Sequence, residues 1–179
     1  MKKLFLTCAV LAGLMLSFTA ASAQTPIVQV VFDEGLNAQT KVCQMGSIDS
    51  LHVVARNFNI WMVGIEFAIQ YPSGISMLGE KVYSDLKIGS TPMGISLVWQ
   101  TPQNAFVPVK LMTVTYVCNV CYPDSPIDVV PHYQSGYVRA TRYPDNEFVY
   151  GMGWRSIFCP YEIPVETTTW GSVKALYDE

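Results

Sequence analysis

The stretch that decides the fold is Trp61-Met62-Val63-Gly64-Ile65-Glu66-Phe67-Ala68-Ile69-Gln70-Tyr71. Its odd-numbered positions all carry large apolar side chains, whereas the even-numbered positions include Gly64, Glu66 and Gln70. Successive side chains of a β-strand point to opposite faces, so this period of two is typical of a strand with one buried face. We therefore expect the odd-numbered side chains of this stretch to point into a core.

The same alternation recurs along the chain and predicts an all-β fold. In residues 27–32, Gln29 points away from the apolar side of the predicted strand. In residues 51–56, His52 and Arg56 likewise point away from the apolar side, so His52 is expected to lie on a partly exposed face. Further strand-like runs cover residues 95–99, 107–118, 127–130, 137–142 and 147–150, and turn-forming clusters occupy residues 71–74, 89–92, 101–104 and 143–146. No long helical period precedes residue 165. Short strands with this punctuation predict one antiparallel β-sandwich or jelly roll over residues 24–160.

Residues 1–23 are predicted to be a secretory signal peptide. Lys2 and Lys3 precede an uncharged apolar stretch, and Ala21-Ser22-Ala23 supplies the small residues of a cleavage site before Gln24. An uncleaved membrane anchor is the alternative, but the stretch is short and ends in small rather than basic residues. No second apolar stretch reaches spanning length, so we expect an exported protein, secreted or periplasmic, without a membrane span after cleavage.

Charge argues against nucleic acid as a partner. The chain has 11 basic and 14 acidic residues, and removal of Lys2 and Lys3 leaves 9 against 14, a formal net charge of −5. No Lys/Arg cluster remains, and nucleic acids and anionic membranes both require concentrated positive charge. Oligomeric state is not indicated by the sequence.

Four cysteines remain after the leader, namely Cys43, Cys118, Cys121 and Cys159. An even number in an exported chain predicts two disulfides, and the sequence leaves all three pairings open. The Cys118-Asn119-Val120-Cys121 spacing allows a small local ring, with Cys43 and Cys159 as the long clasp. A redox Cys-x-x-Cys site and a Cys₄ zinc site are the alternatives. The first lacks a following helix, and the second lacks another close pair in the sequence.

Residues 161–179 form a tail of different character. After an extended run to Thr169, two helical turns are expected, with Trp170, Val173, Leu176 and Tyr177 on one stripe. So short a helix is not stable alone in water and must dock. Its expected site is the sandwich itself, and the alternative is a terminal tag for a partner or sorting machinery.

The order of features resembles the cohesin and carbohydrate-binding-module type of secreted β-sandwich. The segment Val63–Pro72 resembles the Gly-Phe-x-Phe-x-Ile-x-Tyr-Pro pattern of those modules, and Val109–Val117 resembles their long central strand. The match spans residues 27–150 and implies a sandwich fold. Four cysteines are unusual for a cohesin, and the chain contains neither a calcium-loop dockerin motif nor a tandem copy.

Catalytic signals are weak. His52 and His132 are isolated, and the serines lack Gly-x-Ser-x-Gly spacing, which disfavours a triad hydrolase. Glu66 is the best candidate for a glycosidase carboxylate, but its partner cannot be named and it reads more simply as surface. No cofactor is indicated, although Asp33-Glu34 or Asp145-Asn146-Glu147 could hold structural calcium. The chain is therefore expected not to be an enzyme.

Binding fits the composition better. Aromatic residues near predicted loops, namely Trp99, Tyr133, Tyr137 and Trp154, are candidates for contact with a protein or a sugar. The phase of Trp99 with Ile95 and Leu97 nevertheless favours a buried position. The first hypothesis is a non-catalytic module acting by surface contact, in a structural, adhesive or protein-binding role. A carbohydrate-binding module is the second and a small secreted hydrolase the third.

Overall fold

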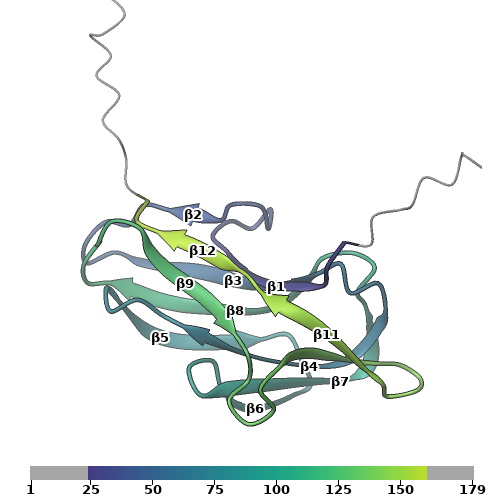
Figure 1. Ribbon diagram of the computed structural model, residues 1–179. Helices are drawn as coiled ribbons and strands as arrows, with labels where there is room; N and C mark the ends of the chain where they lie inside the picture. Colours follow the sequence, from purple (N-terminus) through teal and green to yellow (C-terminus); the bar gives the residue numbers. More distant parts are fainter. Residues whose placement is uncertain (1–23, 161–179) are drawn as a thin grey trace, which may run out of the picture.

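The computed structural model describes residues 24–160, which form a β-sandwich of twelve strands (Figure 1). The predicted all-β sandwich is confirmed. One layer contains, in spatial order, β5 (Ile75–Val82), β8 (Val109–Cys118), β3 (Ile48–Arg56) and β1 (Ile27–Val31). The other layer contains, in spatial order, β6 (Leu86–Ser90), β7 (Gly94–Asn104), β4 (Trp61–Gln70), β10 (Val138–Arg142) and β11 (Phe148–Gly153). The second half of β4 continues into β9 (Ser125–Val130), β12 (Arg155–Phe158) and β2 (Thr40–Lys41).

Most strand pairs are antiparallel, as predicted, but two short pairs are parallel. β1 pairs with β11 through Ile27↔Met152 and Val28↔Gly153, and β12 pairs with β2. The β1–β11 pair connects the two layers into one hydrogen-bonded path. Gly153 permits this junction, because a Cβ atom there would collide with the backbone carbonyl of Val129.

The core lies between the layers and is built from alternate residues of the facing strands. Val28, Val30 and Phe32 face inward while Gln29 faces outward, and Leu51, Val53 and Ala55 do the same in β3, as the sequence predicts. Aromatic rings close one end of this core, where Tyr116 and Phe158 meet edge to face with ring centroids 5.7 Å apart. Each such buried apolar side chain contributes about 1.5–3 kcal/mol to folding relative to an exposed one.

The prediction of which β4 side chains face the core is wrong for the first residues of the strand. Ile65, Phe67 and Ile69 are buried as expected, but Trp61 is 49% exposed and Met62 takes the core position. The pairing of β4 with β7 shifts register between Met62 and Gly64. Such a bulge reverses which residues of the strand point into the core, the odd-numbered or the even-numbered ones. A plain period of two therefore gives the correct face only beyond the bulge.

Four strands were not predicted from the sequence, namely β2, β5, β6 and β12. β5 and β6 are largely exposed edge strands, so no buried face imposes a visible alternation on them. The turn expected at residues 101–104 is also wrong, because these residues end β7. The β4–β7 register jumps from Gly64↔Val98 to Met62↔Gln103, which takes Pro102 out of the ladder.

Both predicted disulfides are present, with pairings Cys43–Cys118 and Cys121–Cys159. The local ring between Cys118 and Cys121 does not form. Each of these two cysteines instead bonds to a residue from a distant loop, with Cα–Cα separations of 6.3 and 5.6 Å. The bridges link the segment before β3, the end of β8 and the segment after β12.

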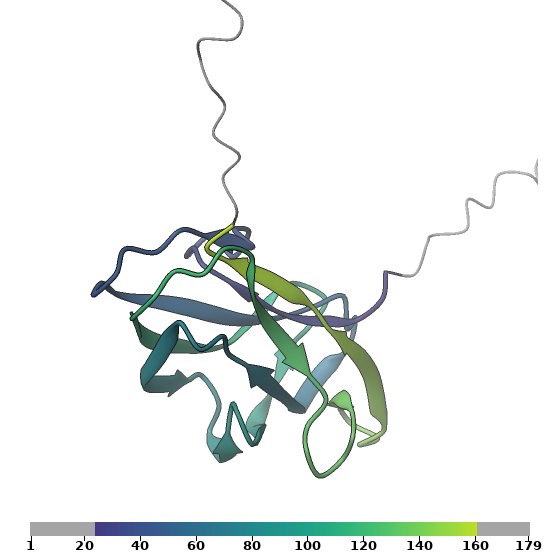
Figure 2. The same cartoon turned by 60° about the vertical axis from the view of Figure 1, so that its left-hand side comes forward.

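The described part begins and ends at separate places on the sandwich (Figure 2). The predicted leader, residues 1–23, and the tail residues Trp170, Val173, Leu176 and Tyr177 lie outside the described residues. Within residues 24–160, no helix is long and apolar enough to cross a membrane.

Candidate functional site

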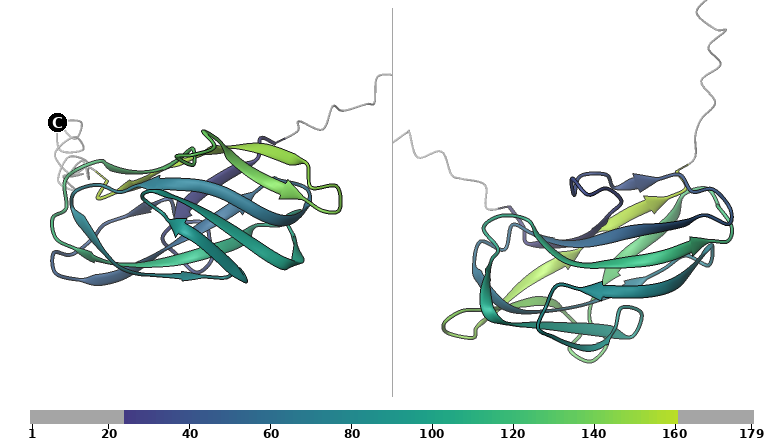
Figure 3. Two further views of the ribbon diagram at one scale, coloured as in Figure 1. Left: turned by 90° about the horizontal axis from the view of Figure 1, so that it is seen from below. Right: turned by 180° about the vertical axis from the view of Figure 1, so that it is seen from behind.

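The two layers turn very different faces to solvent. Figure 3 (left) looks from below toward the layer of β6 and β7. The outer face of this layer is here called the open face, and strand register defines its ten positions. Opposed residues of paired strands share one side of a sheet. The two rows of the open face are therefore Leu86–Val98–Gly64–Thr141–Phe148 and Ile88–Ser96–Glu66–Arg139–Tyr150.

One edge of the open face is aliphatic and the other is aromatic. Leu86, Ile88 and Val98 are 52%, 58% and 39% exposed, and Phe148 and Tyr150 are 47% and 55% exposed. Tyr150 also meets Tyr137 in an edge-to-face pair with ring centroids 5.0 Å apart. The open face therefore carries two groups of exposed apolar side chains, on β6 and β7 and on β11, separated by the open-face positions of β4 and β10.

An ion pair occupies the centre of the open face. Arg139 Nε donates to Glu66 Oε2 at 2.8 Å, and the Arg139 guanidinium lies 3.9 Å from the centroid of the Phe148 ring. Burial acts to raise the pKa of Glu66, but the hydrogen bond and charge of Arg139, together with contributions from Ser135 and His132, outweigh it, so the pKa is lowered. A glycosidase acid requires the opposite shift, because it must hold a proton at neutral pH. Glu66 is thus an ionised anchor for Arg139.

A hollow of about 300 Å³ adjoins the aliphatic edge. Its lining is Ile88, Gly89, Met93, Gly94, Ser96, His132, Tyr133 and Gln134. Gly94 has a φ of +101°, and a Cβ atom there would meet the His132 ring at 2.9 Å, so glycine lets the β6–β7 turn approach the loop of His132. His132 is buried, and its Nδ1 accepts from the backbone N–H of Gln134 at 3.2 Å.

The outer face of the other layer is covered. Gln29, Val31, His52 and Val54 point outward from β1 and β3, yet none is more than 4% exposed. These four residues are here called the covered face. The segment of residues 33–38 lies over them, where Glu34 contacts both His52 (Nε2 to Oε1, 3.3 Å) and Lys110 (Nζ to Oε2, 2.7 Å).

His52 is therefore not the partly exposed residue that the sequence suggests. Its Nδ1 lies 3.0 Å from Thr113 Oγ1, and the covering segment closes the other side of the ring. Burial and the nearby Lys110 charge lower the pKa of His52, while Glu34, Asp33 and Asp49 oppose them. The ring is thus held neutral as a structural group.

The four aromatic residues predicted to contact a protein or a sugar lie in different environments. Tyr137 lies at the aromatic edge of the open face, and Tyr133, 79% exposed, lines the hollow. Trp99 is 5% exposed and its Nε1 donates to the Tyr83 carbonyl at 2.8 Å, so it is a core residue and no binding residue. Trp154 is exposed at 47% but belongs to neither row of the open face.

Five open-face residues were not predicted from the sequence, namely Leu86, Ile88, Val98, Phe148 and Tyr150. A signal exists for the last two, because they alternate with the inward-facing Val149 in a predicted strand. Leu86 and Ile88 lie on β6, which was not predicted.

The carboxylates suggested as calcium ligands already have protein partners. Asp33 Oδ1 accepts from the backbone N–H groups of Asn37 and Ala38 at 2.7 and 2.6 Å. Arg142 binds both Asp145 and Glu147. These contacts occupy the oxygens that a calcium site would use, so bound calcium stays an untested prediction.

Comparison with solved structures identifies several proteins with a similar fold. The sixth cohesin of scaffoldin B from Acetivibrio cellulolyticus, solved with a Cel5 dockerin, superposes with a TM-score of 0.52 at 10% identity, covering 77% of this chain and 100% of that one. The chain has a cohesin-like fold. A cohesin module of a family 33 glycoside hydrolase from Clostridium perfringens gives 0.53 at 7% identity, covering 76% and 98% of the two chains.

A third cohesin-like match is a type I cohesin–dockerin complex from Clostridium thermocellum, with a TM-score of 0.51, 9% identity, and coverage of 74% and 99%. The resemblance noted in the sequence is therefore confirmed for the fold. No protein-family model and no curated protein matches the sequence.

Proposed function

We propose that this cohesin-like domain is a non-catalytic, exported protein-binding module and that its partner docks on the open face. The observation that carries the proposal is the register-matched surface of Leu86, Ile88, Val98, Phe148 and Tyr150 around the Glu66–Arg139 pair. Aromatic residues and arginine are enriched in protein–protein interfaces, and Phe148, Tyr150 and Arg139 supply both on this face.

The cohesins described above supply the second support. Two of them were solved in complexes with dockerins, which are proteins. A shared fold does not transfer a partner, so the case for this chain depends on its own surface. That surface suits a protein partner whose central charges complement Glu66 and Arg139 and whose apolar groups lie on either side of them.

The test compares two isoleucines with similar exposure on different layers. Ile88 on the open face is 58% exposed, and Ile48 on β3 is 67% exposed. The full exported chain is immobilised and incubated with extracellular protein of the producing cells, and retained proteins are identified, purified and titrated against each variant by calorimetry. Ile88→Lys is expected to raise Kd by about 10-fold or more, whereas Ile48→Lys leaves it unchanged. Equal affinities for both variants would contradict docking on the open face.

Carbohydrate binding is the second candidate, supported by the exposed Tyr133 beside the hollow that Ser96 and Gln134 also line. Tyrosine rings stack on sugar faces while neighbouring polar groups bind hydroxyls. A polysaccharide pull-down distinguishes the candidates. Retention that disappears in Tyr133→Ala or Tyr137→Ala favours sugar, and lack of retention with intact protein binding favours the open face.

A further inference from the structure

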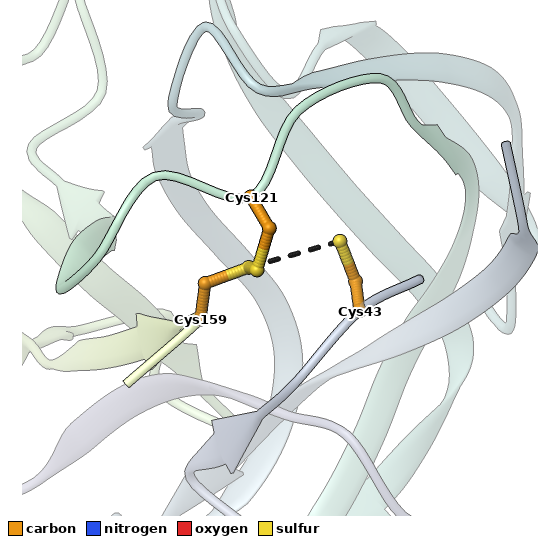
Figure 4. Close-up of side chains that lie close together, drawn as sticks. All are labelled: Cys43, Cys121 and Cys159. Carbon is orange, nitrogen blue, oxygen red and sulfur yellow. Dashed lines mark hydrogen bonds between the residues drawn. A yellow bond between two sulfur atoms is a disulfide. The ribbon is translucent and has the colours of Figure 1, made fainter. Parts of the chain in front are cut away.

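Three of the four cysteines in the described part of the chain lie in one cluster, and the fourth is bonded to one of them. The Sγ atoms of Cys43, Cys121 and Cys159 all lie within 4.8 Å of one another (Figure 4). Cys118 is bonded to Cys43. Within residues 24–160, these cysteines are the only group of three or more metal-ligating residues brought so close. The two disulfides are thus neighbours rather than separate staples.

The distance between the two disulfides suits a tetrahedral metal site. Cys159 Sγ lies 3.7 Å from Cys43 Sγ, the contact marked by a dashed line in Figure 4. A tetrahedral zinc ion with Zn–S bonds of about 2.3 Å holds its sulfur atoms about 3.8 Å apart. One edge of such a tetrahedron is therefore already set. Cys121 Sγ lies within 4.8 Å of both of these atoms, and Cys118 Sγ has to move toward them once its bond to Cys43 is broken.

We propose that, when both disulfides are reduced, the four cysteines bind one Zn²⁺ ion as a Cys₄ site. The reductant is a dithiol, two equivalents of which supply the four electrons and four protons that convert two disulfides into four thiols. Binding of Zn²⁺ then forms four Zn–S bonds and releases the four thiol protons. The same residues thereby stabilise the domain in either of two forms, one crosslinked by disulfides and one by metal.

The ligand set matches zinc in chemistry and in spacing. Four thiolates in tetrahedral arrangement favour Zn²⁺ among the common divalent cations. Cys118-x-x-Cys121 has the chelating spacing of structural zinc sites. The sequence argument against zinc was the lack of a second close pair, but Cys43 and Cys159, 116 residues apart, form that pair in space.

The arrangement also provides a route for the reduction. Cys121 is accessible to solvent, whereas Cys43, Cys118 and Cys159 are buried. A thiolate of the reductant dithiol attacks Cys121 Sγ, forms a mixed disulfide with it and releases the Cys159 thiolate. The second thiol of the reductant then attacks its own sulfur in the mixed disulfide, which closes the oxidised reductant and frees Cys121 as a thiolate. The Cys159 thiolate lies 3.7 Å from Cys43 Sγ, where its attack forms Cys43–Cys159 and releases Cys118 as a thiolate. Reducing equivalents that enter at Cys121 thus reach the buried bridge.

The test titrates Co²⁺, a spectroscopic substitute for Zn²⁺, into the full chain with and without prior reduction by an excess of a phosphine. The reduced protein is expected to bind one Co²⁺ per chain, with the visible bands and thiolate charge-transfer absorption of a tetrahedral tetrathiolate, and Zn²⁺ is expected to displace it. The oxidised protein is expected to show none of this absorption. A reduced chain that develops no tetrahedral thiolate spectrum would overturn the proposal.

Variants distinguish a four-cysteine site from chelation by Cys118 and Cys121 alone. Cys43→Ser and Cys159→Ser are each expected to weaken Co²⁺ binding on the order of 100-fold, because each removes one of four ligands. Ser47→Ala, in the same loop as Cys43, is the matched control and should leave affinity unchanged. Unaltered affinity in both cysteine variants would refute the site.

Circular dichroism keeps the test decisive if the reduced chain unfolds. Added Zn²⁺ is then expected to restore the β-sheet spectrum, and a chelator is expected to remove it again. Metal binding without recovery of the β-sheet spectrum would show that the folded cluster is not the binding site and would overturn the proposal.

Discussion

The covered face and the open face differ in how much of their apolar surface is exposed to solvent. Both are outer surfaces of a pleated layer whose inner side chains form the core. On the covered face, Val31 and Val54 are completely buried, and Glu34 of the segment of residues 33–38 contacts the neighbouring His52. On the open face, Ile88 and Val98 stay 58% and 39% exposed, with no segment of residues 24–160 over them.

The difference shows that the role of an outward-facing apolar residue depends on what lies over it. Glu34 attaches the covering segment to His52 and Lys110, and Arg56 Nη2 donates to the Leu36 carbonyl. The open face has no comparable cover and retains apolar surface for a partner. Substitutions on the covered face should therefore act on stability, and those on the open face on binding.

The largest contrast is expected from a matched pair of charge substitutions. Val54→Asp would place a carboxylate at a position with 0% exposure, and we expect it to cost about 4 kcal/mol or more of the free energy of unfolding. Val98→Asp, its counterpart on the open face, should cost less than about 1 kcal/mol. Urea denaturation measures both, and similar costs would show that the two faces do not differ as described.

A smaller contrast is expected between two arginines. Arg56→Met removes the hydrogen bond to the Leu36 carbonyl that fastens the covering segment, and it should cost about 1 kcal/mol. Arg139→Met, on the open face, removes a surface ion pair and should cost about 0.5 kcal/mol or less. Urea denaturation of the two variants tests this order, and the reverse order would contradict it.

The pH dependence of stability should report the burial of His52. Because burial lowers the pKa of His52 from 6.5, the unfolded chain binds this proton more readily than the folded chain does. Stability is then fully present above pH 6.5 and falls as the pH decreases from there toward the lower, folded-state pKa. Melting temperatures between pH 7 and pH 5 should fall in the wild type.

The control for this pH dependence is His52→Gln, whose melting temperature should change less over the same range. Most carboxylates titrate below this window and do not obscure it. A His132→Gln variant separates the contribution of the second histidine. An unchanged slope in His52→Gln would show that His52 is not the group responsible.

The smallest effect on stability is expected from Ile88→Lys. The side chain is more than half exposed, so the free energy of unfolding should change by no more than about 0.5 kcal/mol. Thermal and urea unfolding measure it. A substantially larger loss would mean that Ile88 belongs to the fold and would weaken the case for a binding surface.

The sequence predicts those parts of the fold where burial imposes a pattern. β1, β3 and most of β4 alternate visibly because one side of each strand faces the core. The bulge at Met62–Gly64 and the exposed β6 carry no such pattern, so the phase of Trp61 and the existence of β6 were not predictable from periodicity.

The candidate site was less predictable because it depends on which strands become neighbours. Tyr137 was identified for its loop position, but its pairing with Tyr150 follows from the register of β10 and β11. Disulfide pairing depends on the fold in the same way, because Cys43 and Cys159 approach only through the arrangement of distant loops. For Trp99, in contrast, the alternation that it shares with Ile95 and Leu97 is enough to predict its buried position.

The parallel junction of β1 with β11 has a consequence for biogenesis. Ile27, close to the start of the sandwich, pairs with Arg56 of β3 on one side, but its neighbour on the other side is Met152, close to the end of the sandwich. Until residue 153 has emerged from a ribosome or a translocation pore, one side of β1 presents unpaired backbone groups that invite association with other chains. Pairing along this side of β1 is therefore completed only once β11 has emerged, and a truncation that removes β11 should yield an aggregating product.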